Sequence, residues 1–448
     1  MSAVYDLAVM GGGIGGYPAA VTAAKAGLKV VLFEEVFLGG ECANYGCIPS
    51  KALLHYALVA HEARRLGIVG GLPEGALHKA LDFAIRSASE ERGGLEALLS
   101  RVGVNVVREH AVLRGCDANR CRVEAGDRVF EARRVLVATG SQPAWPSWAE
   151  RCERILDNRG LFSRGLPDGA DHIAVIGGGV AGVEISLALA RLGASVTIFE
   201  ALERLLPGLP ESLSRIASRM LRRERVETRV STPVSRVKCR DDHVVVCAGG
   251  ECREYDAALV LIGRRPRLDA VQNTLGARLE RDEKLRLRGN PNVYLVGDAA
   301  GPPFLAHKAL MESLTVAADI LGWGWWRRPR VYPQVIYTDP ELVDVTLEDG
   351  EGVRSIRYYW GFAAPARIRG HPAQLVYAEI GYRTDNGRIV YVRLAGPHAS
   401  ELAAEATLII ERGLTLRDVA GVTHPHPSAS EAILEAVLEA LGAGYHRA

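Results

Sequence analysis

The 448-residue chain has almost no net charge and no long apolar run. Lys and Arg number 54 against 53 Asp and Glu, which gives a formal charge of +1. This balance argues against a protein that binds nucleic acid or a membrane surface through bulk charge. The longest apolar segments, such as residues 28–33, have strand length and are far too short to cross a bilayer. The N-terminus carries no basic stretch before a long apolar run, and we expect a cytoplasmic protein.

Cysteine and methionine are also scarce, with eight and four residues. Eight cysteines are too few for a disulfide scaffold at this length, and in a reducing cytosol a close pair is more often catalytic or metal-binding than structural. Scarce methionine is typical of heat-tolerant proteins, although genome base composition produces the same bias. The hydrophobic content of 48% is sufficient for large cores, and the length indicates two to four domains.

One sequence unit occurs twice, at residues 5–34 and 172–200. Each copy is an apolar strand, a G-x-G-x-x-G turn, a helical pattern and a second apolar strand that ends in glutamate. The glycines and the acid are Gly11, Gly13, Gly16 and Glu34 in the first copy, and Gly177, Gly179, Gly182 and Glu200 in the second. The spacing between equivalent positions is constant, which indicates two related folding units rather than two chance glycine turns.

The residue types in this unit suit a dinucleotide. The first glycine permits a tight turn, the second lets the backbone approach a pyrophosphate, and the third allows close packing of helix on strand. The pyrophosphate then lies at the positive end of the helix, and the glutamate accepts hydrogen bonds from ribose hydroxyls. Two units therefore predict two dinucleotides. A 2′-phosphate would be repelled by Glu200, which favours NAD over NADP, although Arg204 nearby leaves NADP open.

Three C-x-x-x-x-C pairs occur, so spacing alone does not identify a reactive one. Cys116/Cys121 and Cys247/Cys252 enclose turn-like sequences between strand patterns, which predicts two β-hairpins with free thiols or, in a hyperthermophile, structural disulfides. Cys42/Cys47 instead follows Glu34 closely and precedes a predicted helix with Pro49 in its first turn. The dipole of that helix stabilises thiolates, and no neighbouring His or Cys completes a zinc site. We therefore expect a redox pair and no metal.

The stretch GGECANYGCIPSKALL resembles the redox-disulfide sequence of the flavoprotein disulfide reductases, and is most similar to the dihydrolipoamide dehydrogenase branch. The resemblance continues through VLVATGS (135–141), LIGRRP (261–266), VYLVGDAAGPPFLAHKA (293–309), VIYTDPEL (335–342) and HPHPSASEA (424–432). It implies an α/β protein with two Rossmann-like domains for FAD and NAD(P) and a C-terminal α+β dimerisation domain. The implied domains are residues 1–142 and 267–330 for FAD, 143–266 for NAD, and 331–448 for dimerisation.

The resemblance also implies roles for six residues. Cys42 would exchange with the substrate disulfide, and Cys47 would lie against the flavin as a thiolate. Lys51 would sit near flavin N5 and pair with Glu184. His426 would move protons on and off the substrate thiols, since its ordinary pKa is about 6.5, and Glu431 would orient its ring. His424 competes for the role of His426. In the family this pair reaches the cysteines of the other subunit, so a homodimer is expected.

The remaining implied contacts belong to the cofactors. For FAD they are Gly11, Gly13, Gly16, Glu34, Lys51, Ala111, Thr139, Gly140, Ser141, Asp298, Leu305, Ala306 and His307; for NAD they are Gly177, Gly179, Gly182, Glu200 and Gly263. The sequence also departs from the resemblance. Glu41 replaces the usual Thr, where it could repel FAD phosphates or thiolates. The cluster Trp323, Trp325 and Trp326 has no counterpart and either packs at a domain junction or contacts a partner.

The expected reaction is oxidation of dihydrolipoamide to lipoamide with reduction of NAD. The alternative is an NAD(P)H-dependent reductase of another disulfide, resembling glutathione or mercuric reductase. A flavoprotein scaffold without turnover is disfavoured by the complete set of reactive residues. The partner would be dihydrolipoamide or a lipoyl-bearing protein. The sequence leaves open whether the chain acts in a 2-oxoacid dehydrogenase complex, in a glycine-cleavage complex or alone.

Overall fold

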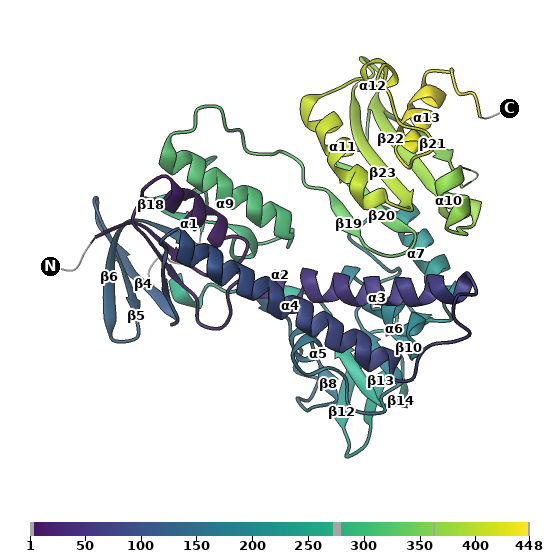
Figure 1. The fold of residues 1–448 in the computed structure, drawn as a ribbon, viewed down its shortest axis with the longest axis horizontal. Coiled ribbons are helices and arrows are strands. Elements are labelled where there is room, and N and C mark those ends of the chain that lie inside the picture. Colours follow the sequence, from purple (N-terminus) through teal and green to yellow (C-terminus); the bar gives the residue numbers. More distant parts are fainter. Residues whose placement is uncertain (1–3, 272–278, 362, 447–448) are drawn as a thin grey trace.

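The first sheet of the fold is mainly parallel, and its strands come from distant parts of the chain. Figure 1 shows the computed structural model, which describes residues 4–271, 279–361 and 363–446. The strand order is β17-β18-β6-β1-β2-β3. The strands β17 and β18 come from a segment that lies far after β6 in sequence, so the sheet joins two separate parts of the chain. The bounds are β1 (Tyr5–Met10), β2 (Val30–Phe33), β3 (Asn105–Val107), β6 (Arg128–Val137), β17 (Arg286–Leu287) and β18 (Asn290–Leu295).

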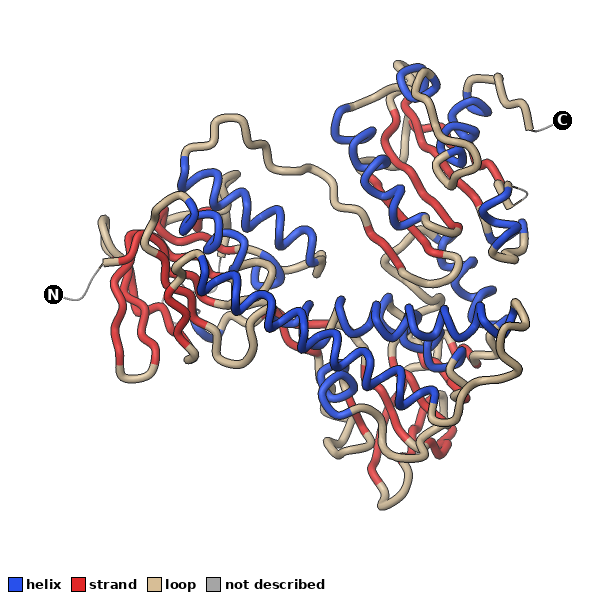
Figure 2. The backbone as a smooth tube through the Cα atoms, in the orientation of Figure 1, coloured by secondary structure: helices blue, strands red, loops and turns tan. Residues whose placement is uncertain are grey.

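Helices α1 (Tyr17–Lys25) and α9 (Ala306–Leu321) pack together beside this sheet. The hairpin of β4 (Ala111–Cys116) and β5 (Cys121–Ala125) pairs with β6 and forms the outer end of the molecule (Figure 2). We refer to this part as the first nucleotide unit.

The second nucleotide unit has a parallel five-stranded sheet of order β11-β10-β9-β15-β8. Its strands are β8 (Ile155–Leu156), β9 (His172–Ile176), β10 (Ser195–Phe199), β11 (Glu227–Arg229) and β15 (Ala257–Val260), and its helices are α5 (Asn158–Arg164), α6 (Val180–Arg191) and α7 (Glu211–Arg223). A smaller antiparallel sheet contains β12 (Val234–Cys239), β13 (Val244–Ala248) and β14 (Glu251–Tyr255). The ribbon β7 (Ser141–Pro143) with β16 (Arg264–Pro266) lies where the chain passes between the units.

Three helices near the N-terminus connect the two units. They are α2 (Gly40–Tyr45), α3 (Cys47–Arg65) and α4 (Ala76–Arg101). Leu53 of α3 and Leu81 of α4 belong to the same buried cluster as Leu161 and Val183 of the second unit. The apolar face of α3 is therefore buried against the second unit, while its N-terminus follows the loop that leaves the first. This packing holds Cys42 and Cys47 between the two units.

The C-terminal part is an antiparallel sheet of order β19-β20-β23-β22-β21 with helices packed against it. Its strands are β19 (Gln334–Ile336), β20 (Glu341–Thr346), β21 (Val353–Tyr359), β22 (Tyr377–Arg383) and β23 (Ile389–Gly396); its helices are α10 (Ala364–Ile368), α11 (Ala399–Arg412), α12 (Leu416–Ala420) and α13 (Glu431–Ala440). The predicted fold class, two Rossmann-like units followed by an α+β domain, is confirmed. The exact domain limits stay predictions.

Six of the eight cysteines form disulfides. Cys116–Cys121 and Cys247–Cys252 join neighbouring strands of the hairpins β4–β5 and β13–β14, so the predicted hairpins are confirmed and disulfides are formed rather than free thiols. A third bond, Cys152–Cys239, was not predicted from the sequence. Cys42 and Cys47 are free thiols. The chemically distinct pair is therefore the one that the resemblance singles out.

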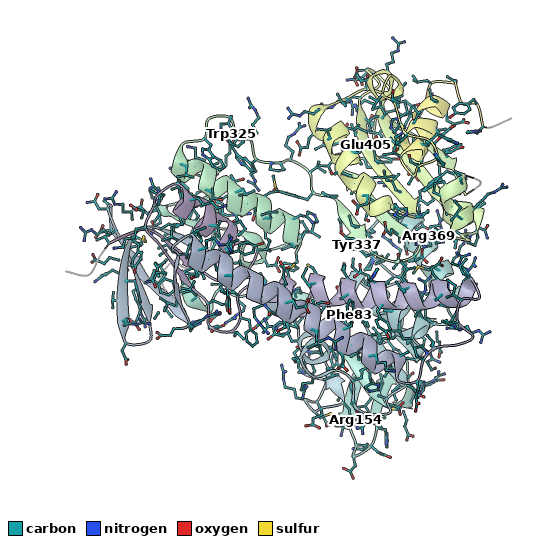
Figure 3. All side chains as sticks on the ribbon, in the orientation of Figure 1. Phe83, Arg154, Trp325, Tyr337, Arg369 and Glu405 are labelled. Atoms are coloured by element: carbon teal, nitrogen blue, oxygen red, sulfur yellow. A yellow bond between two sulfur atoms is a disulfide. The ribbon has the colours of Figure 1, made fainter. Side chains whose placement is uncertain are left out.

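The tryptophan cluster lies in the long segment between α9 and β19. Trp323 and Trp325 stack with ring centroids 5.1 Å apart, and Trp326 donates its indole N–H to Thr315 of α9. Trp325 is 71% exposed at the surface (Figure 3). Within the described ranges, none of the helices combines the length and apolarity needed to cross a membrane.

Candidate active site and dinucleotide sites

A single cavity of about 1230 Å³ runs between the two nucleotide units. It brings together most of the residues that the sequence nominated: Gly11, Gly13, Glu34, Cys42, Cys47, Lys51, Thr139, Gly140, Ser141, Gly177, Gly179, Glu184, Glu200, Gly263, Asp298 and Ala306. Residues far apart in sequence, such as Ser141 and Asp298, meet here at 2.5 Å. The cavity therefore connects both glycine turns with the two free thiols.

The third glycine of each turn has no room for a side chain. A Cβ on Gly16 would lie 2.0 Å from the carbonyl oxygen of Gly11, and one on Gly182 would lie 1.9 Å from that of Gly177. Gly11 and Gly177 both have positive φ, where glycine is favoured. Gly16 and Gly182 do not line the cavity, because their role is to bring helix and strand together behind it.

The two glutamates hold their turns in the same way. Glu34 accepts hydrogen bonds from the backbone N–H groups of Gly12 and Val36, both at 2.9 Å. Glu200 accepts from Gly178 at 2.7 Å and from Leu202 at 2.8 Å. Each carboxylate lies at the end of its strand on the cavity wall. The arrangement fits a dinucleotide in each unit, with the pyrophosphate at the glycine turn and ribose hydroxyls at the acid.

Arg204 is the residue that could have compensated a 2′-phosphate on the second dinucleotide, but its side chain is bonded within its own loop. Its guanidinium donates to the carbonyl oxygens of Leu206, Pro207 and Leu209, the shortest at 2.7 Å. These bonds occupy the side chain within its own loop. The second unit consequently offers Glu200, and not Arg204, at the position where a ribose would lie.

The thiol pair is placed by two short elements. Cys42 lies in α2, and Cys47 is the first residue of α3. A hydrogen bond between the two raises the pKa of the Cys42 thiol and lowers the pKa of Cys47, against the effect of burial on Cys47. The nearby Lys51 ammonium also favours both thiolates. Cys47 is therefore the sulfur that ionises first.

The predicted pairing of Lys51 with Glu184 is confirmed. The ammonium of Lys51 in α3 lies 2.7 Å from the carboxylate of Glu184 in α6, whose side chain is only 2% exposed. Although burial opposes the charge, Glu184 raises the pKa of Lys51. The other oxygen of Glu184 accepts from the backbone N–H of Tyr337, whose ring lies 4.6 Å from the Lys51 ammonium. Tyr337 belongs to the stretch VIYTDPEL (335–342), but the resemblance assigned it no role.

His426 and Glu431 also form the predicted pair. His426 Nδ1 lies 2.8 Å from Glu431, which further accepts from the backbone N–H of Ser428. Burial would raise the pKa of Glu431, but the bond from His426 lowers it. His426 is 78% exposed, whereas His424 is 3% exposed and bonded to Glu405. Of the two histidines, His426 therefore has the accessible ring. It does not line the cavity of its own chain.

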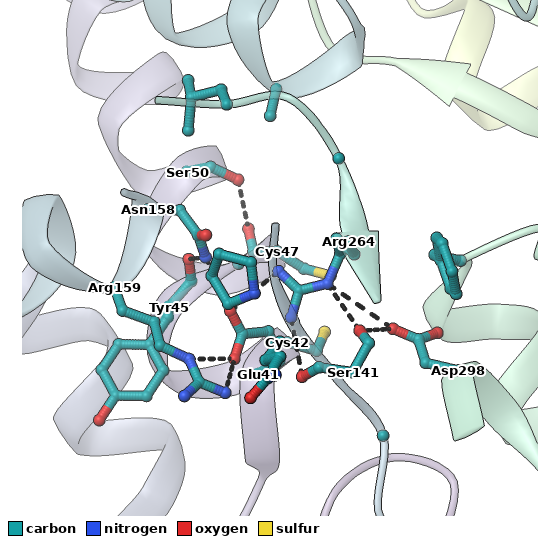
Figure 4. A pocket seen from close by; sticks show the side chains of 18 of the residues that line it. Glu41, Cys42, Tyr45, Cys47, Ser50, Ser141, Asn158, Arg159, Arg264 and Asp298 are labelled. Atoms are coloured by element: carbon teal, nitrogen blue, oxygen red, sulfur yellow. Dashed lines mark hydrogen bonds and ion pairs between the residues drawn. The ribbon is translucent and has the colours of Figure 1, made fainter. Parts of the chain in front are cut away.

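Glu41 is held by two side chains of the second unit and by Arg264 of the ribbon strand β16 (Figure 4). Asn158 donates to it at 2.8 Å, Arg159 at 2.8 Å and Arg264 at 3.0 Å. Although burial raises the pKa of Glu41, the two arginines lower it on balance. These partners were not predicted, because long side chains on separate elements leave no local sequence pattern.

Besides Gly16, three of the nominated FAD residues lie outside the main cavity. Ala111 lines a neighbouring cavity of about 60 Å³, together with Glu34 and Arg267. Leu305 directly precedes α9, and burial lowers the pKa of His307 in the first turn of that helix. In the part of the chain that the structure describes, no cluster of three His, Cys, Asp or Glu side chains has the arrangement of a metal site.

Comparisons with known proteins agree over almost the whole chain. Residues 5–313 match the family model for pyridine nucleotide-disulphide oxidoreductases, and residues 332–437 match the dimerisation domain of that family. Dihydrolipoyl dehydrogenase 3 of Pseudomonas aeruginosa is 35% identical over 98% of each chain. Dihydrolipoyl dehydrogenase of Halobacterium salinarum is 35% identical over 98% of this chain and 97% of its own.

Solved structures show the same fold. LpdA from Mycobacterium tuberculosis superposes with a TM-score of 0.89 at 25% identity, covering 98% of this chain and 100% of its own. The flavoprotein disulfide reductase RclA from Escherichia coli superposes with a TM-score of 0.84 at 22% identity, covering 97% and 99%.

Proposed function

The chain belongs to the pyridine nucleotide-disulphide oxidoreductase family, and we propose that it oxidises dihydrolipoamide to lipoamide while reducing NAD. Membership makes it an oxidoreductase with FAD and NAD(H) as cofactors and a dimerisation domain that supports a homodimer. The observation that carries the proposal is the single cavity that joins both glycine turns to Cys42 and Cys47. The relatives that match this chain over almost their whole length are dihydrolipoyl dehydrogenases.

The thiol chemistry proceeds through the two cysteines. In the oxidised enzyme a substrate thiolate attacks the sulfur of Cys42, so that a mixed disulfide forms and Cys47 leaves as a thiolate. The second substrate thiolate attacks the substrate sulfur of that mixed disulfide, which releases lipoamide and leaves two reduced cysteines. Two electrons have then passed from substrate to protein. FAD, when bound, carries this electron pair from the dithiol to NAD⁺.

Cys47, Lys51 and His426 have distinct roles in these steps. Cys47 is the better leaving thiolate because its pKa is lowered by Cys42 and by Lys51. Lys51, fixed by Glu184, places a positive charge beside the sulfur and the cavity. His426 of the partner subunit would accept the substrate thiol protons, with Glu431 stabilising the charged ring. In this proposal each active site is shared between two copies of the chain.

The preference for NAD follows from charge. Glu200 stands at the ribose position, and a 2′-phosphate there would meet a carboxylate. Arg204 is occupied by three backbone carbonyls, so it does not provide a compensating cation. A cytoplasmic location and a lipoyl-bearing protein partner complete the proposal.

An anaerobic titration tests this function. Purified protein is reduced with dihydrolipoamide, its visible spectrum is recorded, and NAD⁺ or NADP⁺ is then added. We expect a long-wavelength thiolate–flavin band and NADH formation, with little NADPH. Cys47→Ser should reduce turnover by about three orders of magnitude or more, since the covalent route is lost. The double variant Cys116→Ser/Cys121→Ser is the matched control and should retain turnover. If a reduced nicotinamide reduced the flavin but dihydrolipoamide did not, the assignment of dihydrolipoamide as the substrate would be wrong.

A further inference from the structure

Glu41 joins the segment that carries the thiols to the second nucleotide unit. Its neighbour in sequence is Cys42, and both lie in the short helix α2. One carboxylate oxygen accepts hydrogen bonds from Asn158 and Arg264, and the other accepts from Arg159. Asn158 and Arg159 are the first two residues of α5 in the second unit. A single side chain thus makes three contacts across the boundary between the units.

Both ends of α2 are held by the same two residues. Asn158 donates a second hydrogen bond, at 2.8 Å, to the backbone carbonyl of Tyr45 at the end of α2. The guanidinium of Arg159 lies 5.7 Å from the centre of the Tyr45 ring. On the opposite side, Asn44 of α2 donates at 2.9 Å to the carbonyl of Leu38, in the loop that leaves the first unit. The position of Cys42 therefore depends on contacts with both nucleotide units.

The contact also pairs two arginines on the wall of the cavity that holds the thiols. Arg264 bonds the hydroxyl of Ser141 at 2.7 Å and lies 3.8 Å from Asp298, so it faces the cavity. Arg159 lines the same cavity. Glu41 is the carboxylate that both arginines share. Without it, the two arginines would leave uncompensated positive charge in the cavity that Cys42 and Cys47 also line, and positive charge in such a cavity favours thiolates.

We propose that Glu41 is a positioning residue for the redox dithiol: it fastens α2 to the second nucleotide unit and offsets the positive charge of Arg159 and Arg264 at the sulfurs. The ion pair Lys51–Glu184 crosses the same boundary with the opposite polarity. The anion Glu41 beside Cys42 is thus paired with the cations Arg159 and Arg264. The cation Lys51 in α3 is paired with the anion Glu184 of the second unit. The proposal rests on the redox role of Cys42 and Cys47, but not on the identity of the disulfide substrate.

The pH dependence of thiol alkylation tests the charge effect directly. The flavin-loaded protein is reduced with dithiothreitol, freed of reductant and treated with iodoacetamide between pH 4 and pH 9. Modification of the peptide that carries Cys42 and Cys47 is followed by mass spectrometry. Glu41→Gln keeps a hydrogen-bonding side chain and removes the charge. We expect the apparent midpoint of the pair to fall by about 0.5–1 pH unit.

Variants of the arginine make the test symmetrical. Arg159→Gln removes a cation and should raise the midpoint, while Glu41→Gln/Arg159→Gln should return it toward the wild-type value. Glu41→Asp retains the charge and should keep the midpoint. Glu211→Gln, which changes an exposed acid on α7, is the matched control. A wild-type midpoint in Glu41→Gln would overturn the proposal, even if its melting temperature fell.

The outcome is separate from that for the proposed function. Alkylation requires no lipoyl substrate, so a protein that does not oxidise dihydrolipoamide can still show the midpoint shift. Conversely, full turnover with dihydrolipoamide together with identical alkylation profiles in all variants would retain the proposed function and remove the role of Glu41.

Discussion

The equivalent glycines of the two nucleotide units have equivalent close neighbours, yet only the first unit is followed by the cysteine pair Cys42 and Cys47. A Cβ on Gly12 would meet Leu38 at 2.7 Å, and one on Gly178 would meet Leu205 at 2.6 Å. After the strand that ends in glutamate, the sequences of the two units differ. The first unit continues into Cys42 and Cys47, whereas the second continues into a loop closed by Arg204. The repeat thus provides two places for a dinucleotide, and the segment after it decides the chemistry.

The helix that follows each turn has diverged as well. Lys25, at the end of α1, is exposed, while the equivalent Arg191 of α6 is buried. Arg191 pairs with Glu224 and with Asp339 of the C-terminal part, both at 3.0 Å. The second unit is therefore tied through its helix to the C-terminal part by a buried ion pair. Four sets of substitutions test how far the two units have separate roles.

Substitution of the third glycine should separate the two cofactors. In Gly16→Ala the new Cβ would collide with the carbonyl of Gly11, and in Gly182→Ala with that of Gly177. We expect Gly16→Ala to lose bound flavin and Gly182→Ala to retain it while the KM for NAD⁺ rises at least about a hundredfold, equivalent to about 2.7 kcal/mol. Flavin absorbance and steady-state kinetics provide the measurements.

The control for the glycine substitutions is Gly93→Ala. Gly93 lies in α4, where a Cβ would meet nothing within 4 Å, so alanine should leave both cofactors unaffected. Equal loss of flavin from Gly16→Ala and Gly182→Ala would show that the two turns are not independent.

The disulfides should contribute unequally to stability. Cys152–Cys239 closes a long loop in the second unit, with a sequence separation of 87. Cys116–Cys121 in the first unit has a separation of only 5. In the chain-entropy account the long loop is worth about 4.6 kcal/mol and the short one about 2 kcal/mol. Chemical denaturation of the paired Ser variants, Cys152→Ser/Cys239→Ser and Cys116→Ser/Cys121→Ser, measures both. Equal destabilisation would contradict this ranking.

The ion pair at Asp339 should make the junction sensitive to acid. Burial would raise the pKa of Asp339, but the bond from His371 and the charge of Arg191 hold it well below its usual range. Its stabilisation is therefore present above the unfolded pKa of about 3.9 and is lost as the pH falls through the lower folded value. Asp339→Asn should cost about 3 kcal/mol near pH 7.

Melting curves of Asp339→Asn and the wild type between pH 2 and pH 7 test this dependence. The difference between the two proteins should shrink toward the acid end of the range. Asp168→Asn, at a fully exposed aspartate, is the control and should track the wild type. A constant difference across the range would show that Asp339 acts through packing rather than charge.

Sequence analysis located most of the site because its features are local. Glycine turns, strand-terminal acids and the spacing of Cys42, Cys47 and Lys51 each depend on residues within one or two elements. The pairing of Lys51 with Glu184 came from the resemblance. Cys152–Cys239 was missed because its partners are brought together only by the packing of the second unit. The arginines around Glu41 were missed for the same reason, since their reach depends on three separate elements.

The smallest expected effect concerns the glutamate that follows the second strand of each unit, Glu34 in the first and Glu200 in the second. In Glu200→Ala the N–H groups of Gly178 and Leu202 lose their acceptor, and under the proposed function the ribose of NAD would lose one too. We expect the KM for NAD⁺ to rise about tenfold, equivalent to about 1.4 kcal/mol, while flavin content stays unchanged. NADP⁺ should not become a good substrate, because Arg204 remains bonded to the carbonyls of its own loop. Glu34→Ala should show the reverse pattern, with weaker flavin retention and an unchanged KM for NAD⁺. A gain of NADP⁺ turnover in Glu200→Ala would mean that Arg204 leaves its carbonyls for a phosphate, and cofactor choice would then depend on the acid alone.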